Sequence, residues 1–524
     1  MRFKKALFNS VCNVLFFLIS SFFMFFSRSF FIEYLGSEIA GLDGLFKSII
    51  GFLNLAELGL SNVVVYSLYK PLSNNNTKRI NEIMQLYRLL YRIIGFIIIL
   101  LGLVLSFKLD LLASYMINKS LVQNYFILYL FNVSLSYFFT YKYVIAIADQ
   151  NAYIITIIEG TIKIFKSIIQ IVTLVLYKNY LSWLIIEIIS NSIGYIICNY
   201  KIKRIYNKYN LEKCYSGSIK TLIKENLEII KNIKNMFIHK VGSFIVFQTD
   251  TILISKYISL TGVTIYTNYN LVLSLASNIV GQIFNGIGSS IGNLIAAEKS
   301  NEEAYELWKM LQSFNFFLAI VFIVCIYYRI EDFIRLWVGE FYLLDKTSLV
   351  LLLINLYFLI LRGSIGKFKD AYGIFWDRYI PLTEASINLF ISWYLVKIIG
   401  INGVIIGTIV SNIFVMIFWT PYIVFKVGFK HKVIEYHLKN FKLLILALIP
   451  IFITSLINNF AETFFFNNGI LCFIILLLIN FISISVIYSL FLLNEHGFKM
   501  LIRKLFNITK VIIYDKRIYK SNKN

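Results

Sequence analysis

Long apolar stretches separated by short polar connections recur along the whole chain. A helix needs about 20 apolar residues to cross a hydrocarbon layer about 30 Å thick, and each of these stretches is near that length. The pattern therefore predicts about 14 membrane-spanning helices. Their expected ranges are 11–32, 42–66, 89–107, 122–145, 152–176, 181–200, 236–258, 264–290, 310–329, 347–365, 379–398, 403–425, 442–459 and 469–493.

One predicted span, 152–176, carries a line of polar side chains. At about 100° per residue, four of them fall within about 60° of one another on a helix. These four are Glu159, Lys163, Lys166 and Gln170. A charged stripe inside a hydrocarbon layer must face other helices, water or an anionic ligand.

Lys166 is the cation of this stripe that most needs a partner. Glu159 precedes Lys163 by four residues, the favourable order for a helical ion pair, so we expect these two to neutralise each other. Lys166 then remains roughly 21 Å from the start of the span, where a lone lysine costs roughly 3 kcal/mol. A surplus cation at this depth favours an anionic passenger; the alternative is pairing with Asp250 or Glu57 on other helices.

Other predicted spans also contain ionisable side chains. Arg28 lies near the outer end of the first span, where it either snorkels to the interface or contributes a cation to a cavity. Asp43 and Lys47 are spaced to pair with each other, whereas Glu57 and Asp250 lie deeper and must be paired, hydrated or protonated. Three buried carboxylates are candidates for coupling transport to a cation gradient because burial favours proton or sodium binding. They are Glu57, Glu159 and Asp250.

Uncharged polar residues form a second group inside the spans. Three of them share one face of the span 264–290, and others lie in the second, fifth and eleventh spans. They either line a polar cavity or bond one helix to another. The candidates for cavity lining are Asn54, Gln170, Asn278, Gln282, Asn285 and Asn388, and Glu187 and Asn191 add polar groups in the sixth span.

Composition and charge agree with a membrane protein. The chain is 58% hydrophobic and 15% charged, which excludes an ordinary soluble protein. Its net charge of +22 would suit nucleic-acid binding in a soluble protein, but 37 of the 50 Lys and Arg residues fall in alternate connections and only 8 in the others. By the positive-inside rule this bias places both termini in the cytoplasm and explains the charge without nucleic acid. Four His and five scattered Cys predict neither a metal site nor a disulfide framework.

The distribution of loops predicts the domain organisation. The one long connection, 201–235, is basic and separates two sets of about six spans. The two sets share a weak internal similarity at an offset of about 223–225 residues, the usual plan of secondary transporters. We therefore expect an N-terminal six-helix lobe (1–200), a cytoplasmic basic linker (201–235), a C-terminal six-helix lobe (236–430), and two further transmembrane helices with a basic tail (431–524).

Three blocks of sequence resemble a known family. They are YLGSEIAGLDGLFKSIIGFLNLAELGLSNVVVYSLYKPLSNNN (34–76), TDTILISKYISLTGVTIYTNYNLV (249–272) and LTEASINLFISWYLVKIIGINGVIIGTIVSN (382–412). The chain is similar there, in order and as far as about residue 430, to Wzx-type oligosaccharide flippases of the multidrug/oligosaccharidyl-lipid/polysaccharide exporter superfamily.

This resemblance implies an all-α polytopic fold, with two six-helix lobes in a MATE-like V shape and two C-terminal helices. It also implies a function, translocation of an undecaprenyl-pyrophosphate-linked oligosaccharide to the outer leaflet of a bacterial cytoplasmic membrane by alternating access, for surface polysaccharide synthesis. Implied partners are the lipid-linked oligosaccharide, membrane lipids, a polysaccharide polymerase and glycosyltransferases. Arg28 matches a family arginine by position, whereas Lys163 and Lys166 match the family's cationic cavity by character alone. No cofactor is expected beyond a coupling Na⁺ or H⁺.

Three alternatives stay open. A drug antiporter of the same superfamily would need an anionic cavity for cationic drugs, whereas the charged stripe of 152–176 is net positive. A lipid II-type flippase would share the mechanism and carry a different glycan. A membrane-embedded polysaccharide polymerase or ligase would need a large external loop, and no predicted external connection is that long. The chain is therefore expected to be a transporter and not an enzyme.

Overall fold

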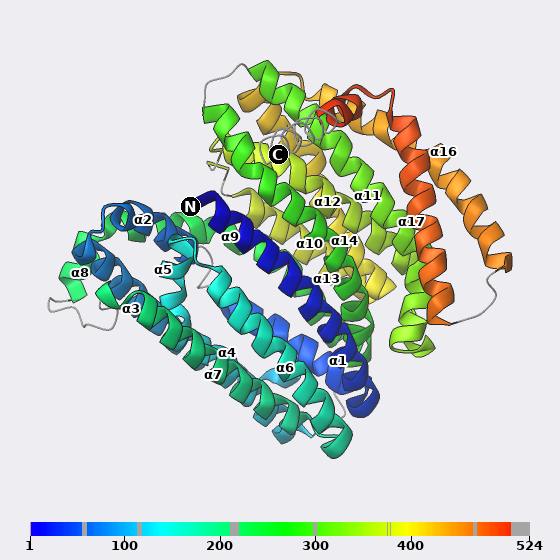
Figure 1. Ribbon diagram of the computed structural model, residues 1–524. Coiled ribbons are helices and arrows are strands. Elements are labelled where there is room, and N and C mark those ends of the chain that lie inside the picture. Colours follow the sequence, from blue (N-terminus) through cyan, green and yellow to red (C-terminus); the bar gives the residue numbers. More distant parts are fainter. Residues whose placement is uncertain are drawn as a thin grey trace, which may run out of the picture. The chain divides into compact units, whose positions relative to one another are not determined.

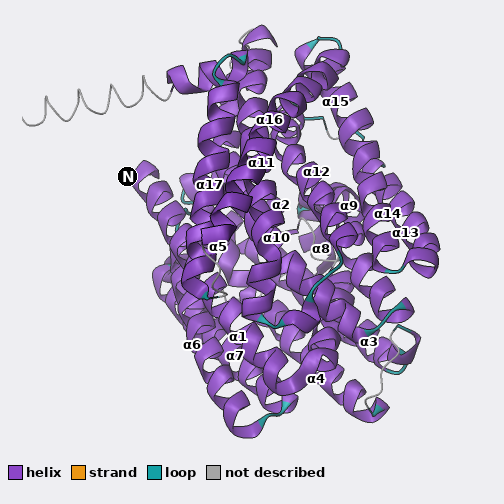
Figure 2. Cartoon of the chain, turned by 90° about the vertical axis from the view of Figure 1, so that its right-hand side faces the viewer, coloured by secondary structure: helices purple, strands orange, loops and turns teal. Residues whose placement is uncertain are grey.

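The structure is a computed structural model that describes residues 2–54, 60–112, 118–209, 219–296, 301–374, 376–377, 379–464 and 469–504. Throughout these ranges the regular elements are helices, and Figure 2 shows them without a strand. The first nine α-helices are α1 (Arg2–Leu53), α2 (Leu60–Ser73), α3 (Thr77–Ser106), α4 (Lys119–Phe139), α5 (Tyr143–Ala148), α6 (Tyr153–Tyr177), α7 (Tyr180–Ile205), α8 (Ile219–Glu225) and α9 (Leu227–Tyr257). The others are α10 (Leu260–Ala296), α11 (Asn301–Trp337), α12 (Lys346–Ala371), α13 (Ile380–Ile399), α14 (Ile401–Ile413), α15 (Thr420–Ile423), α16 (Ile434–Phe464) and α17 (Ile470–Leu492).

The helices are long enough for repeated membrane crossing. Within the described ranges, eleven continuous helical stretches have the length and apolar composition of a membrane span. One of them, α1, joins two helices across a kink, and α9 and α10, at 31 and 37 residues, also exceed the length a span requires. The prediction was about 14 spans, and the described ranges contain eleven stretches that qualify, one of them made of two helices. The prediction of an all-α polytopic membrane protein is confirmed.

The kink in α1 lies at Gly36, whose backbone angles are φ 83° and ψ 167°. A residue with a side chain rarely adopts this φ, so glycine lets the chain turn there between two helices. The corresponding point of the second predicted repeat, 223 residues later, falls in the short connection between α9, which ends at Tyr257, and α10, which begins at Leu260. Both halves of the predicted repeat therefore turn at the same position.

The first of two compact units comprises residues 1–267 together with 381–385. In this unit α6 packs against α1 and α7, and α3 packs against α4 (Figure 1). The helix α9 belongs to the same unit because it packs against α1 and α2. The sequence-based division had placed α9 at the start of the second lobe, since chain order does not record which helices pack together.

The second unit comprises residues 268–380 and 386–524. Here α11 packs against α12 on one side and α17 on another, and α16 packs against α17 (Figure 1). A buried arginine helps to hold this arrangement: Arg329 of α11, 2% exposed, donates hydrogen bonds to Asn458 and Glu462 of α16. The two C-terminal helices are therefore part of the second unit and not a separate appendage.

Candidate functional site

The charged stripe predicted in 152–176 lies on α6, as expected, and its residues meet polar groups of α7. One face of α6 is buried through Ser167, Gln170 and Leu174. Gln170 is 2% exposed and donates from Nε2 to the carbonyl oxygen of Trp183 on α7, at 3.2 Å. Gln170 therefore ties two helices together, which is the interhelical alternative to cavity lining.

Lys166 has a partner that differs from the predicted ones. Its Nζ lies 2.9 Å from Oε1 of Glu187 on α7, and the two side chains are 18% and 22% exposed. The expectation that Lys166 is a surplus cation is therefore corrected; its described partner is Glu187 and not Asp250, and Glu57 lies outside the described residues. Sequence spacing along one helix could not identify this partner, because the two residues belong to different helices brought together by folding.

The predicted pair of Glu159 and Lys163 is looser than expected. Lys163 is exposed and Glu159 half-buried, and no ion pair joins them among the described residues. Lys163 acts on Glu159 at longer range, and Tyr143 and Tyr195 lie close to the same carboxylate. Lys163, and not Lys166, is thus the cation of α6 that remains available to a ligand.

Arg28 lies beside a second ion pair in the same unit. Its guanidinium donates to the hydroxyl of Thr267 at 3.3 Å and lies 5.9 Å from the ring centre of Phe31. Asp43 is within its electrostatic range and forms the predicted pair with Lys47, at 2.7 Å. Arg28 is half-buried among these groups, so part of its side chain packs against the protein.

Tyrosines connect the two ion pairs, and sequence reasoning missed them. The Tyr180 hydroxyl donates to Asp43 at 3.2 Å, and Tyr129 lies within electrostatic range of both Asp43 and Glu187. Tyr180 precedes Glu187 by seven residues, or two helical turns, so both lie on one face of α7. This seven-residue spacing was the sequence signal from which the position of Tyr180 beside Glu187 could have been predicted.

These residues form what we call the α1–α6–α7 network. It contains four cations and three carboxylates and therefore carries a net charge of +1. Its charged members are Arg28, Asp43, Lys47, Glu159, Lys163, Lys166 and Glu187. A net positive polar network within a predicted membrane span can stabilise an anion there.

The other predicted residues are distributed over separate contacts. Asp250, 4% exposed, accepts from the Tyr266 hydroxyl at 2.8 Å, and Asn54 accepts from the Tyr137 hydroxyl at 2.9 Å.

Asn388 is fully buried and donates a hydrogen bond to the Thr408 hydroxyl at 2.9 Å, so it links α13 to α14. Asn278 and Gln282 are exposed on α10. Glu57 and the side chain of Asn285 lie outside the described residues. The predicted site residues therefore do not all meet at one point within a unit.

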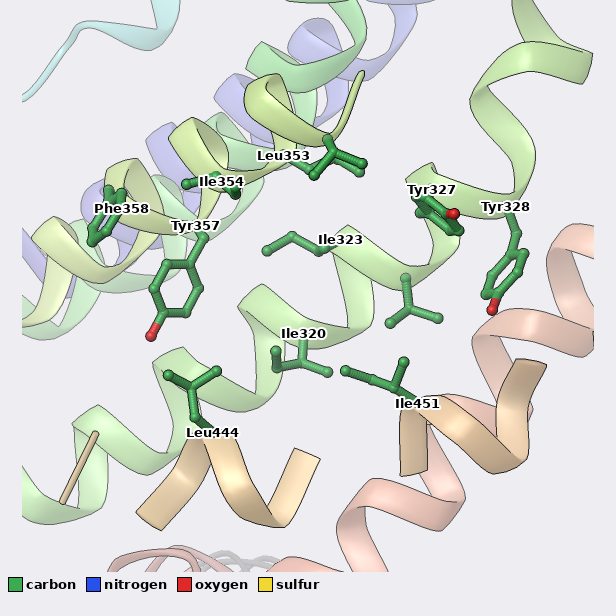
Figure 3. Close-up of a pocket in the computed structure, with 12 residues that line it drawn as sticks. Ile320, Ile323, Tyr327, Tyr328, Leu353, Ile354, Tyr357, Phe358, Leu444 and Ile451 are labelled. Atoms are coloured by element: carbon green, nitrogen blue, oxygen red, sulfur yellow. The ribbon is translucent and has the colours of Figure 1, made fainter. Parts of the chain in front are cut away.

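A cavity of about 490 Å³ lies in the second unit between α11, α12 and α16 (Figure 3). Its walls are aliphatic and aromatic, including Ile320, Leu353 and Ile451 and the rings of Tyr327 and Tyr357, and they are almost wholly apolar. No charged side chain lines it, so this cavity cannot compensate a phosphate charge. In the part of the chain that the structure describes, no group of His, Cys, Asp and Glu side chains is placed to hold a metal ion.

The fold is similar to those of solved transporters and a flippase. The lipid II flippase MurJ in an inward-closed conformation matches with a TM-score of 0.66 and 17% identity, over 92% of this chain and 99% of MurJ. An inward-facing multidrug resistance MATE family transporter of the MOP superfamily matches with a TM-score of 0.58 and 14% identity, over 79% and 97% of the two chains. A mutant of the Vibrio cholerae MATE transporter VcmN gives 0.53 and 16%, over 81% and 98%. No protein-family model matches the chain, and no curated protein matches it.

Proposed function

We propose that this protein is a flippase that moves an undecaprenyl-pyrophosphate-linked oligosaccharide from the cytoplasmic to the external leaflet by alternating access. The observation that carries the proposal is the fold shared with a lipid II flippase over 92% of the chain, against 79–81% for the two MATE transporters. The additional share of this chain that MurJ covers is about as long as α16 and α17 together. A lipid-linked glycan is therefore a better supported passenger class than an organic cation.

The charge of the α1–α6–α7 network supports an anionic passenger. A pyrophosphate that crosses hydrocarbon needs cationic groups to offset its charge, and Lys or Arg can supply them. In this proposal Arg28 and Lys163 contact the phosphate oxygens directly. Lys166 contributes by exchanging Glu187 for a phosphate oxygen, since its ammonium is otherwise engaged.

A cation gradient would drive the cycle in this proposal. Asp250 is 4% exposed and Glu159 is half-buried, and ionisable groups at such positions in a span are candidates to bind the coupling proton or Na⁺. Glu57 keeps the same proposed role. The protein would lie in the bacterial cytoplasmic membrane with both termini in the cytoplasm, and supply its glycan to a polymerase and to other enzymes of surface polysaccharide synthesis.

The test is transport by the purified protein in liposomes that contain a polyprenyl-pyrophosphate oligosaccharide. Accessibility of the glycan in each leaflet is followed with and without a sodium or proton gradient. We expect protein-dependent appearance of the glycan in the opposite leaflet, a strong reduction in Arg28→Ala, and a smaller one in Arg28→Lys, which keeps the charge but loses the guanidinium geometry.

Parallel vesicles loaded with an organic cation separate the competing function. Efflux of the cation without glycan movement would favour a MATE-like antiporter and overturn the flippase proposal. Wild-type transport in Arg28→Ala would leave the proposed passenger unchanged but would show that Arg28 does not bind it.

A further inference from the structure

The helix pair formed by α8 and the start of α9 has one buried and one exposed face. Leu222, Asn226 and Ile229 are at most 5% exposed, and α8 packs against α3. The Asn226 side chain donates to the carbonyl oxygen of Leu222 at 2.8 Å, which closes the turn between α8 and α9. This segment is thus fixed to the first unit through one face, and the opposite face is left open.

The open face combines lysines with large apolar side chains. Leu227, Lys231 and Lys234 follow one another at intervals of four and three residues and lie within about 60° on the helix. Leu227 is 59% exposed and Phe237 36% exposed. Neither Lys231 nor Lys234 forms an ion pair within the described residues. We call these four residues the α9 entry patch.

The length of α9 places this patch at the boundary of the hydrocarbon layer. About 20 residues, counted back from Tyr257 at the far end of α9, cross roughly 30 Å and end near Phe237. Lys234 and Lys231 then lie roughly 5 and 9 Å beyond that boundary, at headgroup depth. An aromatic side chain at the boundary followed by lysines in the headgroup layer is the arrangement of an interfacial anchor.

We propose that the α9 entry patch binds the phosphate groups of anionic phospholipids in the leaflet predicted to be cytoplasmic. The segment that contains the patch is positively charged and therefore complementary to anionic headgroups, because residues 201–237 contain nine Lys and Arg against three Glu. The exposed Leu227 and Phe237 favour a lipid surface over an acidic protein, since both reach apolar surroundings beside the headgroups. Glu228, on the flank of the same helix, opposes this attraction. The inference does not depend on the proposed passenger.

The experiment measures lipid composition next to the patch. The full-length protein carries a donor fluorophore on Asn232→Cys, with Cys214 and Cys472 replaced by serine, in vesicles of phosphatidylcholine with 30% phosphatidylglycerol. Energy transfer to trace labelled phosphatidylglycerol is compared with transfer to trace labelled phosphatidylcholine. We expect preferential transfer to phosphatidylglycerol that weakens as salt is raised from 0.1 M to 1 M.

Variants decide whether the patch is responsible. Lys231→Gln with Lys234→Gln should reduce the preference roughly tenfold, Lys231→Arg with Lys234→Arg should keep it, and Glu228→Gln should increase it. The same charge change at two exposed lysines elsewhere, Lys178→Gln with Lys397→Gln, should leave it unaltered.

Equal transfer to the two lipids, or an unchanged preference in the double glutamine variant, would overturn the proposal. Displacement of labelled phosphatidylglycerol by a few molecules of undecaprenyl pyrophosphate per protein would also overturn it, because the patch would then belong to the route of the transported lipid. A size-exclusion profile like that of the wild type confirms that each variant is folded.

Discussion

Replacing Glu187 by alanine is expected to destabilise the first unit, because it leaves the ammonium of Lys166 without its carboxylate. The two groups lie 2.9 Å apart and are about one-fifth exposed. Breaking a fully buried ion pair costs about 3–5 kcal/mol, whereas an exposed pair contributes about 0–1 kcal/mol. For this partly exposed pair we expect a loss of roughly 2 kcal/mol.

A double replacement separates the stability of the pair from its role in transport. Lys166→Met with Glu187→Leu removes both charges and keeps similar volumes, which for a buried pair is often neutral or stabilising. The apparent melting temperature in detergent should therefore fall in Glu187→Ala and return close to the wild-type value in the double variant. Lys163→Met is the matched control on the same helix, and because Lys163 is exposed it should change the melting temperature little.

Transport measured on the same variants tests the remaining role of Lys166. If its ammonium contacts phosphate during transport, the double variant is stable but transports poorly. A double variant as unstable as Glu187→Ala would refute the reasoning, since the loss would then not come from the unpaired lysine. Wild-type transport in the stable double variant would show that Lys166 acts only through its ion pair.

Three further changes test packing and charge. Gly41→Ala should destabilise the contact between α1 and α10 and lower the melting temperature, because an added Cβ would lie 1.9 Å from the carbonyl oxygen of Leu260. Arg329→Met should cost roughly 2 kcal/mol, because it removes the hydrogen bonds of a buried arginine to Asn458 and to Glu462, whose side chain is 48% exposed. Burial would raise the pKa of Glu495, but the ion pair with Lys439 holds this pKa below its usual value near 4.5. The stability that Glu495 contributes is therefore present above pH 4.5 and is lost as the pH falls through the lower pKa of the folded state. Melting temperature recorded between about pH 6 and 3 should show this loss, and Glu495→Gln should remove it.

Each of these changes has a control on the same protein. Gly281→Ala adds a Cβ where no atom lies within 4 Å and should leave the melting temperature unchanged. Arg335, 43% exposed and 3.6 Å from Glu340, should tolerate methionine with a loss below about 1 kcal/mol. Equal effects of Gly41→Ala and Gly281→Ala, or of the two arginine changes, would contradict the packing argument. An unchanged pH profile in Glu495→Gln would assign the acid sensitivity to another group.

The membrane-spanning helices could be predicted because they depend on information local to the sequence. A run of about 20 apolar residues has one stable arrangement in a bilayer, a helix that bonds its own backbone. The polar stripe of α6 and the pair of Asp43 and Lys47 follow from the same helical geometry. The turn at Gly36 and its counterpart before Leu260 lie in the connections expected between spans 11–32 and 42–66 and between spans 236–258 and 264–290.

Partners on different helices were decided by tertiary packing alone. Lys166 and Glu187 are 21 residues apart, Tyr180 and Asp43 are 137 apart, and no periodicity relates such positions. The same holds for α9, which packs with α1 and α2 despite following the long connection. Helix formation needs contacts only three or four residues apart, whereas an ion pair between helices depends on how two whole segments rotate and dock. The sequence by itself therefore determined the helices and their polar faces, and the tertiary structure determined which charges neutralise one another and which remain for a ligand.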